Sequence, residues 1–151
     1  MFNMTKGELE TFLAQAHVGV LSVEQLGKGP LTVPLWYDYE PGGTVWMITD
    51  RESVKGKLLQ NAGRISLCVQ TEIPPYQYVS VEGPFTMTDL QPGQVESMAK
   101  RYYGDERGKA YAEVAEPALV SGMIVSLEPQ TWYTADYSKS PYQFGATTNP
   151  V

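Results

Sequence analysis

Short runs of alternating apolar and polar residues, each bounded by glycine or proline, restrict this chain to a mainly β fold. Period-two alternation is the pattern of strands that bury one face. The predicted strands cover residues 18–23, 31–40, 44–49, 64–70, 76–82, 85–88, 122–127 and 131–133. Hairpin-type connections with few helices between them predict an antiparallel β-barrel with flanking helices.

Turn signals refine this prediction. Pro41-Gly42-Gly43 predicts a hairpin that pairs 31–40 with 44–49. Pro34 cannot donate to a strand ladder, so a free edge or a bulge is expected there. Gly83-Pro84 predicts a bulge or a sharp bend.

Helices are expected beside the strands. Thr5 and Glu8 form a capping-box pattern before apolar residues at helical spacing, which predicts an N-terminal helix of about three turns. The later helices are expected over 94–103 and 109–114.

Size and charge limit the functional classes. The chain has 151 residues, which suits one domain over 1–151 with a tail over 136–151 that is either disordered or wraps a partner subunit. A net charge of -6 argues against nucleic acid as the main partner. The acidic N-terminus and the lack of a long apolar run predict a cytoplasmic protein without a membrane span. The single cysteine excludes an internal disulfide and a cysteine-cluster metal site, and no metal is expected.

Positive charge is concentrated in one window, residues 45–69. It holds four of the eleven Lys and Arg residues, namely Arg51, Lys55, Lys57 and Arg64. Ser53 is a predicted N-cap of a short helix that Gly56 weakens, and a helix N-terminus beside Lys55 is a phosphate-binding arrangement. Lys57 points about 200° away from Lys55 on a regular helix. The alternative is that these are solvated lysines on a surface helix.

The order of residues in this window resembles a known signature. A strand ending in Thr49, then Ser53-x-Lys55-x-Lys57-x-Leu59, then Asn61-x-x-Arg64-x-Ser66-Leu67, is similar to the pyridoxamine 5'-phosphate oxidase-like superfamily of FMN-binding split barrels. That superfamily includes flavin/deazaflavin oxidoreductases that use F420. The resemblance covers roughly residues 5–90 and implies a homodimer of split barrels, with a cofactor in each of two interface grooves.

The resemblance also implies roles for individual residues. Ser53, Lys55 and Lys57, with the adjoining Val54, would hold the cofactor phosphate. The other implied contacts are Met47, Ile48 and Thr49 along the ring or ribityl chain, and Thr32, Val33 and Pro34 at the isoalloxazine edge. The partner subunit would close the site with Tyr76, Gln77, Tyr78 and Trp132, and the tyrosines and Trp132 would line the substrate pocket.

Two departures bear on the reaction. The chain is short at its C-terminus and lacks the Arg and His pattern that grips the substrate phosphate in true pyridoxamine 5'-phosphate oxidases, so vitamin B6 oxidation is not expected. His17 and Cys68 are predicted to be structural, and no catalytic side chain is assigned. A hydride-transfer enzyme needs none, because the cofactor carries the redox chemistry.

The leading prediction is an F420-dependent oxidoreductase that passes a hydride to a small, flat, unsaturated substrate. Arg51, Lys57 and Arg64 could contact the polyglutamate tail of F420. FMN is the alternative cofactor in the same fold. A non-catalytic carrier of flavin, haem or an apolar ligand, and a purely structural barrel, are the alternatives from other classes.

Overall fold

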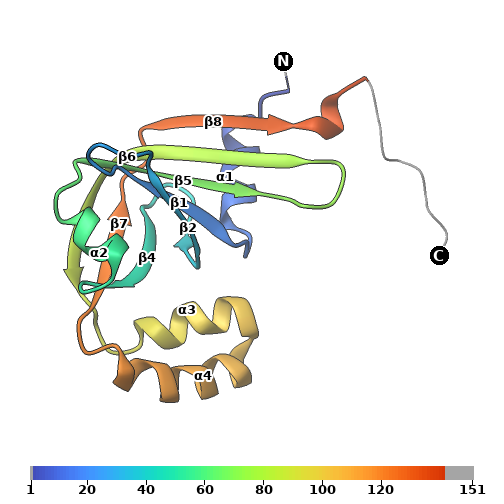
Figure 1. The fold of residues 1–151 in the computed structure, drawn as a ribbon. Coiled ribbons are helices and arrows are strands. Elements are labelled where there is room, and N and C mark those ends of the chain that lie inside the picture. The colour runs from blue at the N-terminus through green and yellow to red at the C-terminus, as the bar shows by residue number, and fades with distance from the viewer. Residues whose placement is uncertain (1, 142–151) are drawn as a thin grey trace.

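A single antiparallel sheet that curls on itself forms most of the molecule. The computed structural model describes residues 2–141. In sheet order the described strands run β2-β1-β5-β6-β7-β4-β3, with β8 paired to β6, and every pairing is antiparallel (Figure 1). Their bounds are Gly19–Val23 (β1), Leu31–Leu35 (β2), Asp38–Tyr39 (β3), Val45–Asp50 (β4), Arg64–Gln70 (β5), Gln77–Asp89 (β6), Gly122–Leu127 (β7) and Thr131–Asp136 (β8). The predicted β class is confirmed.

The long strand β6 carries the curl. Its first half pairs with β5 and β8, and its second half, from Phe85 to Asp89, pairs with β7. The change of partner falls at the predicted bend, where a Cβ on Gly83 would lie 1.9 Å from the Glu128 carbonyl oxygen. Glycine therefore permits this close backbone approach. The two runs predicted around the bend are one continuous strand.

The inner face of the curled sheet holds the main core. Alternate residues of β1, β4 and β5 are buried there, and β4 shows the pattern clearly, with Val45, Met47 and Thr49 buried and the residues between them partly exposed. The helix α1 (Lys6–Ala14) adds Phe12 and Leu13 to this core. Its capping box forms as predicted, since Glu8 N–H donates to the Thr5 hydroxyl and Thr5 N–H donates to the Glu8 carboxylate.

A helical hairpin covers the outer face near β4 and β7. It consists of α3 (Gln94–Tyr103) and α4 (Asp105–Ala118) and lies below those strands in Figure 1. Ile124 of β7 is buried although it points away from the barrel core, and Val95, Met98 and Ala112 are buried with it. The two helices approach closely at Gly108, where an added Cβ would lie 2.5 Å from the Lys100 backbone nitrogen. The helix predicted over 109–114 is longer at both ends.

The prediction of one continuous strand over 31–40 that pairs with 44–49 is wrong, because the strand breaks at Trp36 and Tyr37. β2 pairs with β1 and not with 44–49, and only the two residues of β3 pair with β4. The physical reason is that Tyr37 N–H donates to the Tyr102 hydroxyl and the Tyr37 carbonyl accepts from Arg101 Nε, so α3 side chains replace the ladder there. Among the described strands β2 ends the sheet, which confirms the free edge expected at Pro34.

The two ends of the described chain meet at β8. Asp136 N–H donates to the Phe2 carbonyl at 2.7 Å, and Met4 N–H donates to the Thr134 hydroxyl at 2.9 Å. β8 runs three residues beyond its predicted end, and a 3-10 turn over Tyr137–Lys139 follows. Most of the predicted tail, 142–151, lies outside the described residues. None of the described helices combines the length and apolar character that a membrane span requires.

Candidate cofactor site

The short helix α2 (Val54–Leu59) begins where the sequence predicted. The Ser53 hydroxyl caps it by accepting from Gly56 N–H at 3.0 Å and donates to the Asp50 carbonyl at 2.7 Å. A Cβ on Gly56 would lie 2.1 Å from the Asp50 carbonyl oxygen and 2.9 Å from that of Arg51. Gly56 thus lets the first turn of α2 rest directly on the end of β4, which fixes where its N-terminus sits.

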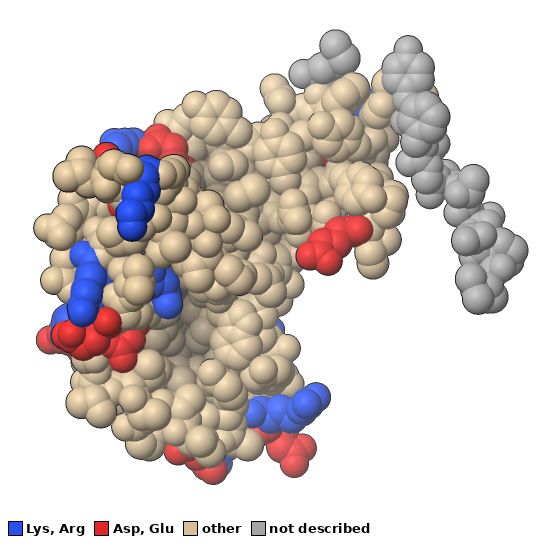
Figure 2. All heavy atoms as spheres, in the orientation of Figure 1, with Lys and Arg blue, Asp and Glu red and all other residues tan. Residues whose placement is uncertain are grey.

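Most of the positive charge in this window is already paired. Arg51 pairs with Asp89, Arg64 with Glu82 at 2.9 Å, and the exposed Lys57 with Glu52 at 4.0 Å. The Arg64 guanidinium also donates to the Gln130 side chain at 2.7 Å. Figure 2 shows blue side chains beside red ones at the left edge of the molecule. The window therefore carries less free positive charge than its composition suggested.

Lys55 is the exception. Within residues 2–141 its ammonium has no carboxylate at ion-pair distance. Its charge contributes to lowering the pKa of Asp50, after the larger effects of hydrogen bonds from the Ser121 hydroxyl and the Glu52 amide. Lys55 is half-buried and is the second residue of α2, and the neighbouring Val54 side chain is 68% exposed. A cation without a partner at a helix N-terminus favours an anionic ligand.

The candidate residues on β4 divide between two faces. Met47 is fully buried and Thr49 is 3% exposed, so both face the barrel core, with the Thr49 hydroxyl 3.5 Å from that of Ser53. Ile48 lies on the opposite face. Met47 and Thr49 can therefore meet a ligand on that outer face through their backbone, while Ile48 offers its side chain.

The candidate residues on β2 are at the other end of the sheet. Thr32 and Pro34 are exposed, and Val33 packs against the core. Only Trp36 and Tyr37 separate β2 from β3, so this short link joins the two end strands of the sheet.

Comparison with known proteins now decides the fold family. No protein-family model and no curated protein sequence matches the chain. Conserved hypothetical protein Rv2991 from Mycobacterium tuberculosis superimposes with a TM-score of 0.71 at 19% identity, over 90% of this chain and 87% of its own. An F420 reductase gives 0.61 at 17% identity, over 82% and 94%, and a provisional pyridoxamine 5'-phosphate oxidase from Listeria innocua gives 0.60 at 13%, over 85% and 96%. The chain has their split-barrel fold.

The remaining candidates of this split barrel lie elsewhere. Tyr78 on β6 and Trp132 on β8 line a separate cavity of about 360 Å³ together with Met4 and Leu9, and no residue of α2 or its cap lines it. The Trp132 ring also packs on Tyr39, with 6.3 Å between centroids. Tyr76 and Gln77 precede Tyr78 at the start of β6. Their predicted contact with the cofactor depends on a second subunit and stays a prediction.

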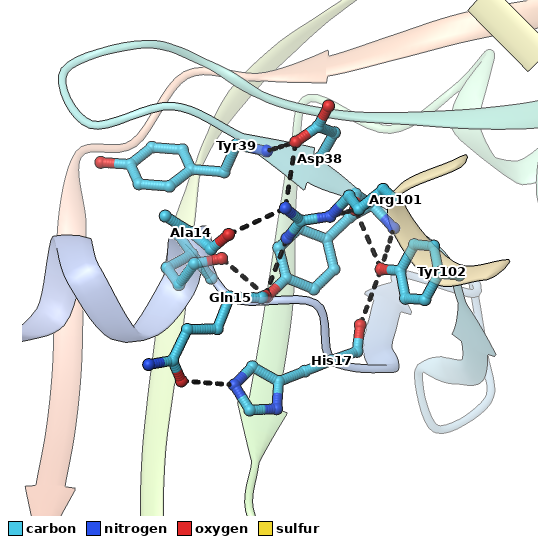
Figure 3. Close-up of polar contacts among 9 residues, drawn as sticks. Ala14, Gln15, His17, Asp38, Tyr39, Arg101 and Tyr102 are labelled. Carbon is cyan, nitrogen blue, oxygen red and sulfur yellow. Dashed lines mark hydrogen bonds and ion pairs between the residues drawn. The ribbon is translucent and has the colours of Figure 1, made fainter. Parts of the chain in front are cut away.

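One arginine that supports the split barrel was missed by the sequence reasoning. Arg101 of α3 donates to the carbonyls of Ala14, Gln15 and Tyr37 at 2.8, 2.8 and 2.9 Å, and lies 3.3 Å from the Asp38 carboxylate (Figure 3). Its side chain is only 13% exposed. The Arg-Tyr-Tyr sequence that ends the predicted helix was the available signal, since a basic residue among aromatics often packs inward on its stem.

Aromatic side chains complete this support. The Tyr102 hydroxyl accepts from Tyr37 N–H and lies 2.7 Å from the His17 carbonyl, and the Tyr37 hydroxyl donates to the Leu13 carbonyl at 2.8 Å. Burial raises the pKa of Tyr37 far above its ordinary value. Together with Arg101, these residues tie α1, the β2–β3 junction and α3 into one unit.

His17 and Cys68 have structural surroundings. The His17 ring stacks on Phe12 and contacts the Gln15 side chain at 3.2 Å, and burial followed by the charge of Arg101 lowers its pKa. Burial also raises the pKa of the Cys68 thiol, which disfavours the nucleophilic thiolate. In the described part of the chain, no group of three or more His, Cys, Asp or Glu side chains is arranged to hold a metal.

Proposed function

We propose that this split barrel is a flavin- or deazaflavin-dependent oxidoreductase, with F420 as its cofactor and FMN as the alternative. The fold is shared with an F420 reductase and with a provisional pyridoxamine 5'-phosphate oxidase. The proposal rests chiefly on Lys55, a half-buried cation beside the capped start of α2 that has no carboxylate partner within residues 2–141. When bound, the cofactor supplies the hydride chemistry.

The residues of the chain would hold this cofactor by its phosphate. The Lys55 ammonium and the N–H groups of the first turn of α2 supply the donors. The Ser53 hydroxyl, which now donates to the Asp50 carbonyl, would turn to the phosphate while still accepting from Gly56 N–H. Ile48 and the exposed edge of β2, at Thr32 and Pro34, would border the ring system and exclude water from one side.

F420 and FMN differ in the number of negative charges that extend beyond the phosphate. Of the basic residues that could contact a polyglutamate tail, Arg51 and Arg64 already have carboxylate partners. The Lys57 pair with Glu52 is long and exposed, so it costs little to exchange. Lys57 is therefore the proposed contact for the tail of F420.

A cytoplasmic homodimer forms part of the proposal. β2 ends the described sheet with a free edge, and Figure 2 shows an uncharged central surface with charged side chains gathered at its margins. A broad surface with so few charges suits burial against a second copy. The second copy would bring Tyr78 and Trp132 to the groove.

Fluorescence titration with F420 and with FMN tests the cofactor. Binding of F420 with a Kd below about 100 µM, or roughly 5.5 kcal/mol, is expected. Lys55→Met should weaken binding by about 10- to 100-fold, which corresponds to the loss of one charge-assisted hydrogen bond. Lys57→Met is the matched control for the phosphate, and it should weaken FMN less than about threefold.

The outcomes separate the alternatives. Binding of neither cofactor would refute the assignment. Equal weakening of FMN binding by both lysine variants would place the phosphate elsewhere. Oxidation of the reduced cofactor by added unsaturated acceptors then tests turnover. Tight binding without turnover would identify a carrier protein.

A further inference from the structure

We infer that a cavity outside the barrel, between β4 and the α3–α4 hairpin, binds an uncharged planar ring compound. This assignment rests on the proposed function, in which the cavity takes the ring of the unsaturated substrate. It differs from the sequence-based prediction, which put the substrate among Tyr76, Tyr78 and Trp132.

The side chains that line the cavity are aliphatic or aromatic. Its volume is about 210 Å³, and Ile48 of β4 and Trp36 form one side, while Val95 and Met98 of α3 and Tyr111 and Ala115 of α4 form the other. Among the described residues, no charged side chain lines it. Such a cavity excludes ions, because an unpaired buried charge is costly, and favours apolar ligands.

The aromatic wall of the cavity favours a flat ring. The Trp36 indole is stacked on Tyr102, with 4.8 Å between centroids and an interplanar angle of 10°, and Tyr103 meets it edge-on at 5.1 Å. The Tyr111 ring lies 5.4 Å away. Since Tyr102 is itself hydrogen-bonded to the backbone of Tyr37, Trp36 is a fixed wall. A rigid aromatic wall stacks best with another planar ring.

The volume limits the ligand to a small ring system. An apolar cavity of about 150 Å³ holds a benzene ring, so this one suits a substituted benzene or two fused rings. Larger polycyclic compounds exceed it unless α3 and α4 move apart.

The cavity adjoins the proposed cofactor site. Ile48, which lines it, directly precedes Thr49, whose hydroxyl is 3.5 Å from that of Ser53. At the end of β4, the Ser121 hydroxyl donates to the Asp50 carboxylate at 2.6 Å, and the Ser121 carbonyl accepts from Arg51 N–H at 3.0 Å. A ring held against Ile48 therefore contacts β4, the strand on whose end the first turn of α2 rests.

Calorimetry with indole as the probe, in the absence of any cofactor, tests the site. Indole should bind saturably at one site per chain, and indole-3-carboxylate should not bind. Ala115→Leu fills the cavity and should raise the Kd of indole by about tenfold or more. Ala110→Leu makes the same change at an exposed position of the same helix, and should alter the Kd less than about twofold.

A second measurement needs no variant. Nuclear Overhauser contacts from indole to the Met98 and Ile48 methyl groups of the wild-type protein are expected, and their absence would overturn the inference. Equal binding to wild type and to Ala115→Leu would overturn it as well. Cofactor titration run in parallel keeps the two proposals apart: bound F420 without indole binding refutes this site alone, and indole binding without cofactor binding refutes the proposed function alone.

Discussion

Replacing the largely buried Arg101 with methionine should destabilise this protein strongly. The guanidinium joins three elements, since it donates to carbonyls at the end of α1 and at the β2–β3 junction from its place on α3. It also lies over the Tyr37 ring, 5.1 Å from the centroid. Methionine keeps the stem that packs on this ring but removes every donor.

The magnitude follows from the hydrogen bonds that methionine cannot make. Three charge-assisted hydrogen bonds at about 1.5–3 kcal/mol each set an upper range of roughly 4.5–9 kcal/mol. Water can reach the Gln15 carbonyl, because Gln15 is exposed, and this recovers part of the loss. The Asp38 carboxylate also loses its cationic partner, and breaking such a pair costs about 3–5 kcal/mol when it is buried. We therefore expect the free energy of unfolding to fall by about 3–5 kcal/mol, which corresponds to a decrease of roughly 6–20 °C in Tm.

Urea unfolding followed by tryptophan fluorescence measures the change. Lys100→Met is the matched control, because the neighbouring lysine forms only an exposed pair with Glu96 at 3.6 Å. It should cost less than about 0.5 kcal/mol. A loss below about 1 kcal/mol for Arg101→Met would refute the idea that this arginine holds the three elements together.

Three further changes test other parts of the structure. Gly56→Ala should lower the free energy of unfolding by about 1–3 kcal/mol, because the added Cβ meets the Asp50 carbonyl. Gly7→Ala is the control in open space and should raise it by up to about 1 kcal/mol. A stabilised G56A in thermal unfolding would contradict the geometry. For His17, the folded-state pKa lies below the ordinary value, so the unfolded chain binds the proton first and stability should fall as the pH drops below about 6.5. His17→Gln should flatten that part of the pH profile, and an unchanged profile would show that another group titrates. Tyr102→Phe should lower stability by about 1–3 kcal/mol by leaving Tyr37 N–H unpaired, with Tyr103→Phe as the near-neutral control.

Local pattern was enough to predict most strands and the start of α2. Arg64–Gln70 and Gly122–Leu127 were predicted with the bounds that the structure shows, because alternation and bounding turns are local properties. The Ser53 cap was equally readable, since its partner is the amide three residues ahead. The role of Gly56 was only half predicted. The sequence indicated that glycine weakens the helix, but the need for glycine comes from the close contact with the Asp50 carbonyl, which only the folded structure shows.

The pairing of strands and the use of charge could not be predicted in the same way. The hairpin expected between 31–40 and 44–49 failed because Tyr102 and Arg101, about 65 positions away, satisfy the Tyr37 backbone. Likewise Arg51 and Arg64 looked available until folding brought Asp89 and Glu82 to them. Neither carboxylate is near its partner in sequence.

Alternation of short apolar runs therefore settles that this chain is a curled antiparallel sheet, because each strand must bury one face. The order of residues over 45–69 likewise predicts where an anion would bind. Only the tertiary structure decides that Lys55 has no carboxylate partner in the described chain while its basic neighbours are paired. It also decides that the α3–α4 hairpin borders an apolar cavity beside Ile48. Ion pairs and cavities form between residues distant in sequence, whereas a strand pattern and a helix cap need only their neighbours.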